Sequence, residues 1–237
     1  MSKKHSEEPA CSKPAAGKKP KSVRRRLAPE ARAEMIIDSA VTFFAEHGFD
    51  GQMKDLAAQS GVSQALIFAY FGSKQALIEK VYDRVYVSRW EQKWQVLLED
   101  RTRLLENRLI DYYKDYLAAI DEPIWIRIAL YSGLSGNELT RRYVSERVEN
   151  ILRTIARETC ETFAIDKQHC RESDLYEMVW DLQASFLYGL IRKHVWRLPM
   201  MEDSDRLVRI RVRAFLDTLT ARQRELARQR KPRAIEE

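Results

Sequence analysis

Cysteine is scarce in this sequence. Its 237 residues include only Cys11, Cys160 and Cys170, an odd number at no spacing that would build a disulfide framework. Stabilising disulfides belong to oxidising compartments, so we expect a protein of the reducing cytoplasm. Cys160 and Cys170, together with His169 and Glu172, match no helical pair or zinc knuckle. The sequence therefore predicts no metal site.

Long apolar runs are absent as well. No stretch approaches the roughly 20 apolar residues that span a bilayer, and the basic N-terminus lacks the apolar core of a secretory signal. There is no glycine-rich phosphate loop and no Ser/His/Asp or paired-carboxylate arrangement. His194 has no partner that the sequence reveals, and we expect a structural role for it. These absences predict a protein that is not an enzyme, uses no cofactor and does not enter a membrane.

The excess positive charge lies at one end of the chain. The net charge of +6 divides into +7 for residues 1–26 (nine basic, two acidic) and −1 for the other 211 residues (32 basic, 33 acidic). Residues 1–26 cannot bury a core, so we expect a disordered basic arm. Two interpretations of the arm are open. It is either a solvated tail or a segment attracted to nucleic acid, since clustered cations displace condensed counterions.

Helical periodicity dominates from Pro29 onward, and no strand alternation appears, which predicts an all-α fold. Ser63 and Ser73 are placed to cap the helices that follow them. The expected helices cover residues 29–47, 53–60, 64–71, 74–99, 101–120, a short piece after Pro123, 138–163, 174–197 and 204–230.

The second and third helices are joined by the turn Gly61-Val62-Ser63, which is the arrangement of a helix-turn-helix motif. The last helix of such a motif lies in the major groove of DNA. The side chains expected to brace it are Leu56, Ala57, Val62, Ile67 and Phe71. Its other face is expected to be exposed and comprises Gln64, Ala65, Phe68, Ala69 and Tyr70.

Three connected stretches resemble the TetR-type bacterial transcription regulators: FFAEHGF (residues 43–49), KDLAAQSGVS (54–63) and AYFGSK (69–74). The resemblance is confined to the N-terminal quarter of the chain. It implies an all-α homodimer that binds double-stranded DNA. The implied parts are the basic arm (1–26), a three-helix DNA-binding domain (27–87, helix-turn-helix 52–71), a larger ligand-binding and dimerisation domain (88–230) and a tail (231–237). It also implies that the exposed face of the third helix enters the groove.

The chain departs from the family pattern at two places. Gly51-Gln52 stands where members usually have Thr or Ser, and Phe68 stands where they usually have Tyr. Both changes remove a hydroxyl that commonly meets a phosphate. Residues 27–90 have a formal charge of −2 (six basic, eight acidic), so we expect the arm to supply cations, with its arginines in a minor groove.

Base reading is expected to be sparse, because Gln64 is the one side chain of the third helix able to pair with adenine in a bidentate manner. Ala65, Phe68 and Ala69 offer only apolar contact, while Tyr70 and Lys74 resemble phosphate contacts of the family. The predicted DNA-contact residues are Arg24, Arg25, Arg26, Gln52, Lys54, Ser63, Gln64, Ala65, Phe68, Ala69, Tyr70 and Lys74.

Large aromatic residues are frequent beyond Ser88. They either pack a core or line a pocket for a small apolar or aromatic effector. The pocket candidates are Trp94, Tyr112, Tyr116, Trp125, Tyr131, Trp180 and Gln183. The last two helices either form a dimer surface or pack only within one chain. In the final helix the expected apolar side comprises Leu207, Ile210, Ala214, Leu216 and Leu219.

The combined pattern predicts a dimeric DNA-binding transcription regulator, a repressor that a small molecule releases from a palindromic operator. Two alternatives remain. One is a DNA-binding protein controlled by a protein partner without a small ligand, which a dry and filled core would favour. The other is an all-α enzyme or carrier, which a catalytic constellation inside a pocket would favour.

Overall fold

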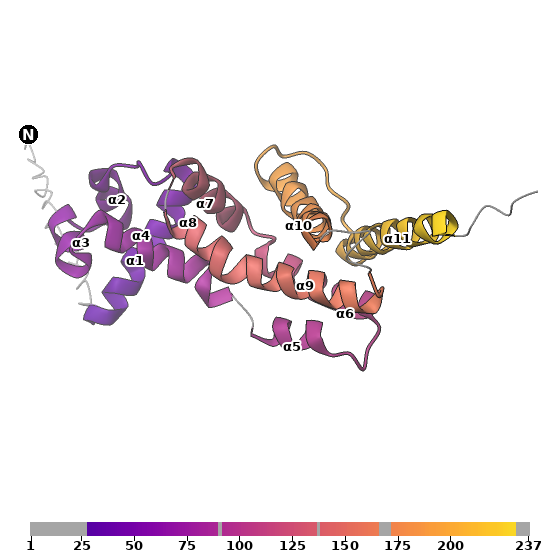
Figure 1. Cartoon of the computed structure of the whole chain (residues 1–237). Helices are drawn as coiled ribbons and strands as arrows, with labels where there is room; N and C mark the ends of the chain where they lie inside the picture. The colour runs from indigo at the N-terminus through magenta and orange to yellow at the C-terminus, as the bar shows by residue number, and fades with distance from the viewer. Residues whose placement is uncertain (1–27, 90–91, 137, 166–171, 231–237) are drawn as a thin grey trace, which may run out of the picture.

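The computed structural model describes residues 28–89, 92–136, 138–165 and 172–230, and every regular element within them is helical (Figure 1). The expected all-α fold is confirmed. Helices α1 (Pro29–His47), α2 (Met53–Ser60), α3 (Gln64–Phe71) and α4 (Lys74–Val85) gather at one end of the molecule (Figure 1). Among the described residues, no helix is both long and apolar enough to cross a membrane.

Local sequence signals set the ends of the first helices. Pro29 occupies the first turn of α1, where its fixed φ suits the helix, and Gly48 ends that helix with a φ of 72°. Gly61 ends α2 in the left-handed conformation, with a φ of 65°. The Oγ atoms of Ser63 and Ser73 each accept a backbone hydrogen bond at 3.1 Å, from Leu66 and Ala76 respectively. Both predicted caps are confirmed.

The expected single helix over residues 74–99 is wrong. Helix α4 ends at Val85, a short 3-10 turn follows, and α5 covers Lys93–Glu99. Arg89 explains the break, because it donates a hydrogen bond to the Ala119 carbonyl at 3.1 Å and pairs with Glu122. These contacts hold the chain against the C-terminal end of α6 (Leu105–Ile120). Tertiary contact here overrides the local helical propensity of the sequence.

The remaining helices are α6 (Leu105–Ile120), α7 (Pro123–Leu134), α8 (Glu138–Tyr143), α9 (Glu149–Thr162), α10 (Glu172–His194) and α11 (Ser204–Arg230). A π-helical segment, Val144–Val148, joins α8 to α9 within the stretch expected to be one helix. Helix α6 begins later than expected, because Asp100 accepts hydrogen bonds from the backbone N–H and hydroxyl of Thr102 and forms a turn there.

The expected apolar side of α11 is partly wrong. Its buried side chains are Leu207, Val208, Val212, Phe215 and Leu219. Ile210 is 48% exposed and Ala214 is also exposed, because the inward stripe of the helix runs through positions 208, 212, 215 and 219, where α11 packs against α6 and α10.

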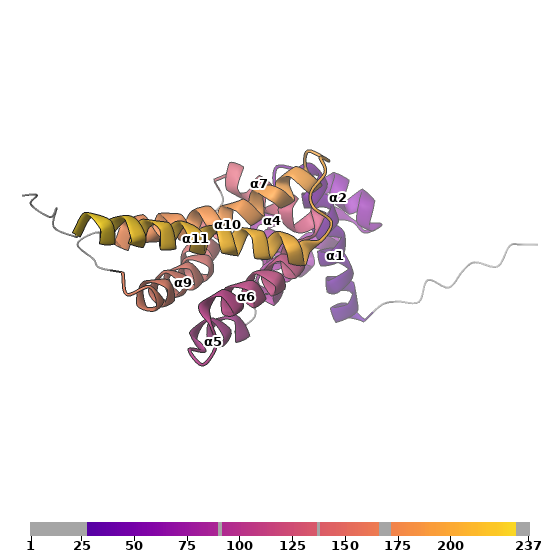
Figure 2. The same ribbon diagram turned by 90° about the vertical axis from the view of Figure 1, so that its right-hand side faces the viewer.

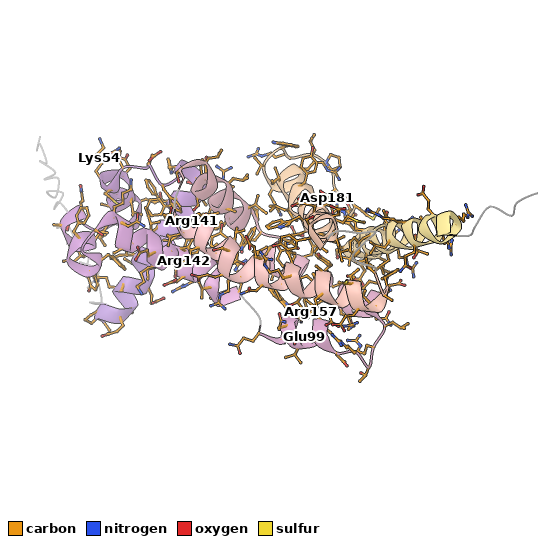
Figure 3. The ribbon with its side chains drawn as sticks, viewed as in Figure 1. Lys54, Glu99, Arg141, Arg142, Arg157 and Asp181 are labelled. Atoms are coloured by element: carbon orange, nitrogen blue, oxygen red, sulfur yellow. The ribbon has the colours of Figure 1, made fainter. Side chains whose placement is uncertain are left out.

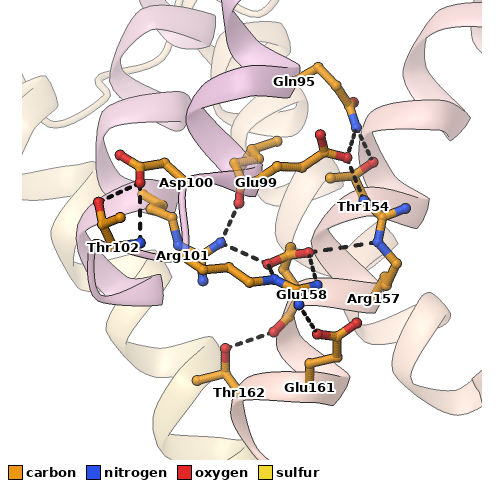
Figure 4. A network of polar contacts seen from close by, with 12 residues as sticks. Gln95, Glu99, Asp100, Arg101, Thr102, Thr154, Arg157, Glu158, Glu161 and Thr162 are labelled. Carbon is orange, nitrogen blue, oxygen red and sulfur yellow. Dashed lines mark hydrogen bonds and ion pairs between the residues drawn. The ribbon is translucent and has the colours of Figure 1, made fainter.

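A buried ion pair around Glu158 ties three helices together (Figure 4). The Glu158 carboxylate on α9 accepts hydrogen bonds from Arg101 at 2.8 Å and from Arg108 on α6 at 2.9 Å. Arg108 also donates to the Leu98 carbonyl on α5. The side chains of Glu158 and Arg108 are each 3% exposed, so both charges are desolvated and each is matched by the other.

Candidate DNA-binding surface

Helix α3 is anchored by the face that the sequence predicts. Leu56, Ala57 and Ile67 are buried, while Val62 and Phe71 are half-buried and pack against the same core. The capping bond of Ser63 fixes the first turn of the helix. Together these contacts hold α3 rigidly while its opposite side stays accessible.

The opposite face of α3 is only partly open. Gln64, Ala65 and Ala69 are exposed as expected. Phe68 and Tyr70 are half-buried and pack against the core, so the expectation that both rings stand free is wrong. Phe68 and Tyr70 adjoin Ile67 and Phe71 in the sequence, and their large rings pack against the same core. Gln64, in the first turn, is therefore the exposed polar side chain of this face.

Cations flank α3 on both sides. Lys54 is exposed in the first turn of α2 and points away from the molecule (Figure 3), and half-buried Lys74 is the first residue of α4. Neither has an ion pair within the described residues. Arg84 is not available, since it pairs with Glu34 and Asp38 of α1. Helix starts add backbone N–H groups and a positive dipole end, which favour phosphate.

Gly51, just before α2, packs closely against α1. A Cβ at this position would lie 2.5 Å from Cε1 of Phe43, closer than side chains approach one another. Phe43 is buried and stacks on His47, with ring centroids 4.6 Å apart. Close packing thus leaves little room for a side chain at position 51. Gln52 occupies the N-cap position of α2, where its exposed side chain makes no capping bond.

Helix α7 holds the C-terminal end of α1. Arg127 donates to the Ala45 carbonyl, and the Tyr131 hydroxyl donates to the Glu46 carbonyl at 3.4 Å. The Tyr131 ring also lies against Gly48, where a Cβ would approach within 3.0 Å of it. Cationic and hydroxyl donors here satisfy carbonyls that a helix end leaves unpaired. Tyr131, a pocket candidate from the sequence, therefore forms part of this junction.

Four of the other pocket candidates come together inside the C-terminal half. Trp94, Tyr112 and Tyr116 are buried, and their ring centroids lie between 5.7 and 5.9 Å apart. Burial raises the pKa of Tyr112 and Tyr116 well above the usual value. Gln183 is buried and hydrogen-bonded to Tyr116, but its Oε1 atom has no hydrogen-bond partner among the described residues.

Two further candidates lie elsewhere. Trp125 packs against Tyr86 with centroids 5.1 Å apart, and half-buried Trp180 packs against Tyr176 at 6.3 Å. A separate polar cleft opens between α4 and α8, where Figure 3 labels Arg141 and Arg142. Its lining shares no residue with the pocket candidates.

No group of three potential metal ligands occurs among the described residues, and His169 and Cys170 lie outside them, as do Arg24, Arg25 and Arg26 of the arm. The structure identifies the partner of His194 that the sequence did not reveal. Its Nε2 atom lies 2.6 Å from Oδ1 of Asp121. The Lys193 ammonium lies 2.6 Å from Oδ2 of the same carboxylate. Burial opposes ionisation of Asp121, but these hydrogen bonds lower its pKa below the usual value.

Residues 36–81 match the family model described as bacterial regulatory proteins, tetR family. Over 130 residues the chain is 28% identical to the HTH-type transcriptional repressor SCO4008 of Streptomyces coelicolor, an alignment that covers 54% of this chain and 63% of that protein. The fold is similar to a TetR-like transcriptional regulator from Rhodococcus sp. RHA1, with a TM-score of 0.57 and 18% identity over 85% of this chain and 99% of that one. It is also similar to the flavonoid-responsive regulator FrrA, with a TM-score of 0.54 and 20% identity over 81% and 96% of the two chains.

Proposed function

This chain belongs to the TetR family of bacterial regulatory proteins, and on that premise we propose that it is a DNA-binding repressor which a small molecule releases from a palindromic operator. The observation that carries the proposal is the geometry of α3. This helix is capped at Ser63 and braced by α2, and it keeps Gln64 and two alanines accessible. Its position and chemistry suit a helix that enters a major groove.

Each side chain of this surface has a distinct proposed role. Gln64 reads one base, because its amide can donate to and accept from adenine at once. Ala65, Phe68 and Ala69 pack against sugars or thymine methyl groups. The phosphate contacts come from Gln52, Lys54, Ser63, Tyr70, Lys74 and the adjoining helix starts. Such a surface reads few bases directly, so DNA shape supplies part of the specificity.

The basic arm supplies the charge that this surface lacks. In residues 28–89 the internal pairs of Arg84 and Arg89 remove two of the cations, and the acidic residues outnumber those that remain. Duplex DNA carries one negative charge per roughly 1.7 Å of its axis. Arg24, Arg25 and Arg26 precede α1 in the sequence, and we propose that they reach a neighbouring minor groove.

Two copies of the chain bind the two halves of the operator. Each copy presents one α3, and adjacent half-sites on one side of the duplex lie about 34–36 Å apart. We place the contact between the copies on α10 and α11, which leave apolar side chains exposed. A symmetric dimer explains why the operator is palindromic.

The proposed effector is a small apolar or aromatic molecule that enters the C-terminal half near Trp94, Tyr112, Tyr116 and Gln183. The unpartnered Gln183 Oε1 atom would accept a hydrogen bond from a polar group of that molecule. The similar fold of FrrA, described as flavonoid-responsive, supports an aromatic ligand class.

The junction between α1 and α7 provides the route for release. A ligand shifts an equilibrium only if it prefers one conformation. Displacement of α7 would move the carbonyls of Ala45 and Glu46 through Arg127 and Tyr131, and α1 would follow. Arg84 would transmit the same movement between α4 and α1. The two copies of α3 would then lose the spacing that the operator requires.

Genome-wide footprinting of the purified protein tests the proposal and reveals the operator. We expect protected palindromes, and Gln64→Ala should relax the preference at one base pair per half-site by roughly 1–3 kcal/mol. Gln92→Ala, an exposed glutamine outside the first four helices, is the matched control and should leave every position unchanged. Absence of any protected site would overturn the proposal.

One observation favours a second candidate, a DNA-binding protein controlled by a protein partner. The rings of Trp94, Tyr112 and Tyr116 pack closely against one another, as they would in a filled core. A panel of small aromatic compounds, added to the complex of the protein with its operator DNA, separates the two candidates. Release of the operator by one such compound supports the ligand-controlled repressor, whereas release only by another protein supports the second candidate.

A further inference from the structure

Helices α10 and α11 lie side by side along one side of the molecule (Figure 2). Several large apolar side chains on these helices and just beyond α10 are exposed. Tyr188 is 55% exposed and Trp196, just beyond the end of α10, is 50% exposed. Their rings meet edge to face, with centroids 5.4 Å apart. On α11, Ile210 is 48% exposed. Grouped apolar side chains of this size on a surface mark a contact site.

Two arginines of these helices lack an anion. The Nε atom of Arg192 and the Nη1 atom of Arg211 are buried and have no hydrogen-bond partner, and neither guanidinium has an ion pair within the described residues. Arg211 lies over the Phe186 ring, 4.9 Å from its centroid. Burial and the charge of Arg192 both lower the pKa of Arg211. Partly buried cations next to each other are costly unless an acid joins them.

The same helix offers an acid without a partner. Asp181 is exposed on α10 (Figure 3) and has no ion pair within the described residues. Arg192 follows eleven residues later, which is three helical turns, so the two side chains share one face at a separation of roughly 16 Å. Exposed Ala184 and Tyr188 stand between them on that face. The face therefore has a carboxylate at one end, a small residue and a ring in the middle, and a guanidinium at the other end.

We propose that a second copy of this chain docks on this face with the two α10 helices antiparallel, so that Asp181 of each copy pairs with Arg192 of the other. A two-fold axis midway between these positions brings both pairs together at once, because an isologous interface repeats every contact twice. Tyr188 of one copy then lies against the small residues at positions 184 and 185 of the other. Arg211 adjoins the pair and gains the same carboxylate.

The occupant is a second copy because this face is complementary to itself. A free phosphate would neutralise Arg192 and Arg211 but would leave Tyr188 and Trp196 in water and Asp181 without a cation. The chain itself provides both the apolar surface and the acid. The inference rests on the dimer of the proposed function, and it adds the two residues that set the register between the subunits.

Charge reversal in the full-length protein, measured without DNA by analytical ultracentrifugation, tests the pairing. Asp181→Arg and Arg192→Asp should each raise the dimer dissociation constant by about tenfold or more, since each places like charges together. The double variant D181R/R192D should recover the wild-type value. An equimolar mixture of the two single variants should form heterodimers, in which both pairs are again opposite in charge. Asp83→Arg, at an exposed acid on α4, controls for the added charge and should leave the constant unchanged.

The possible outcomes distinguish a failure of the pairing between Asp181 and Arg192 from a failure of the proposed dimer. A wild-type dimer whose dissociation constant is unmoved by both single reversals would overturn the pairing and leave the dimeric repressor standing. A monomeric wild type would overturn the dimer itself, and the pairing with it. Circular dichroism confirms that each variant is folded. If a reversal unfolds the chain, Asp181→Asn and Arg192→Gln replace it, and a failure of both to weaken the dimer would likewise overturn the pairing.

Discussion

Arg108 and Glu158 form an ion pair at 2.9 Å in which each side chain is 3% exposed. The pair joins α6 to α9, and Arg101 completes it from the solvent side. Buried ion pairs contribute little relative to apolar packing, but removal of one partner leaves the other charge buried and unmatched.

Glu158→Gln should therefore lower the free energy of unfolding by about 3–5 kcal/mol. Urea denaturation followed by circular dichroism measures this change. Glu161→Gln is the matched control, because Glu161 also pairs with Arg101 but is 49% exposed. An exposed pair is worth no more than about 1 kcal/mol. Equal effects of the two substitutions would contradict the assignment of Glu158 as the buried anchor.

The same carboxylate should make stability depend on acid pH. Hydrogen bonds from Arg101 and Arg108 lower the pKa of Glu158 from 4.5 to about 2, although burial opposes this shift. A carboxyl whose pKa is lower in the folded state stabilises the fold above its unfolded pKa and loses that contribution as pH falls toward its folded pKa. The stability difference between wild type and Glu158→Gln should thus shrink between about pH 5 and pH 2. A difference that stays constant over this range would refute the shift.

Gly51→Ala should destabilise the first four helices, since the new Cβ would lie 2.5 Å from the Phe43 ring. Overpacking of this kind costs about 1–3 kcal/mol. Thermal unfolding should show a lower Tm, and Gly51→Ser should do the same, because serine places a Cβ at the same position. Gly133→Ala is the control, because nothing lies within 4 Å of its Cβ position. A Gly51→Ala protein as stable as wild type would show that Phe43 relaxes freely.

Deletion of residues 1–26 should weaken binding to all DNA sequences and reduce the dependence of affinity on salt. Each lost phosphate contact reduces the magnitude of the negative slope of log K against log salt concentration by about 0.9. Fluorescence anisotropy at several salt concentrations measures both effects. Replacement of Arg24, Arg25 and Arg26 by alanine tests whether these three account for the change. An unchanged slope after deletion would remove the arm from the DNA contacts.

The helix boundaries and caps of the helix-turn-helix region were predictable, because their signals are local. The serines at positions 63 and 73 cap helices through atoms three residues away, and Gly61 ends α2 through its own backbone conformation. A cap or a left-handed glycine needs no distant partner. The family resemblance covers the same stretch, so both arguments concern one part of the chain.

Prediction from the sequence failed or was silent where a distant partner decides the structure. The break after Val85 depends on contacts of Arg89 with residues about 30 positions later, and the partner of His194 is Asp121. Tyr131 was expected in a pocket, but its ring packs on Gly48. Aromatic character alone cannot tell a wall of a pocket from a packed junction, since both bury the ring.

The sequence by itself determined the all-α class, the helix-turn-helix and the confinement of positive charge to one end, because periodicity, capping and charge are properties of neighbouring residues. Only the tertiary structure decided that Phe68 and Tyr70 pack against the core, that Gly51 lies close to the Phe43 ring, and that α10 carries Asp181 and Arg192 on one face. Those facts depend on which surfaces meet in the folded chain. Packing between residues far apart in sequence selects them, and local pattern does not encode it.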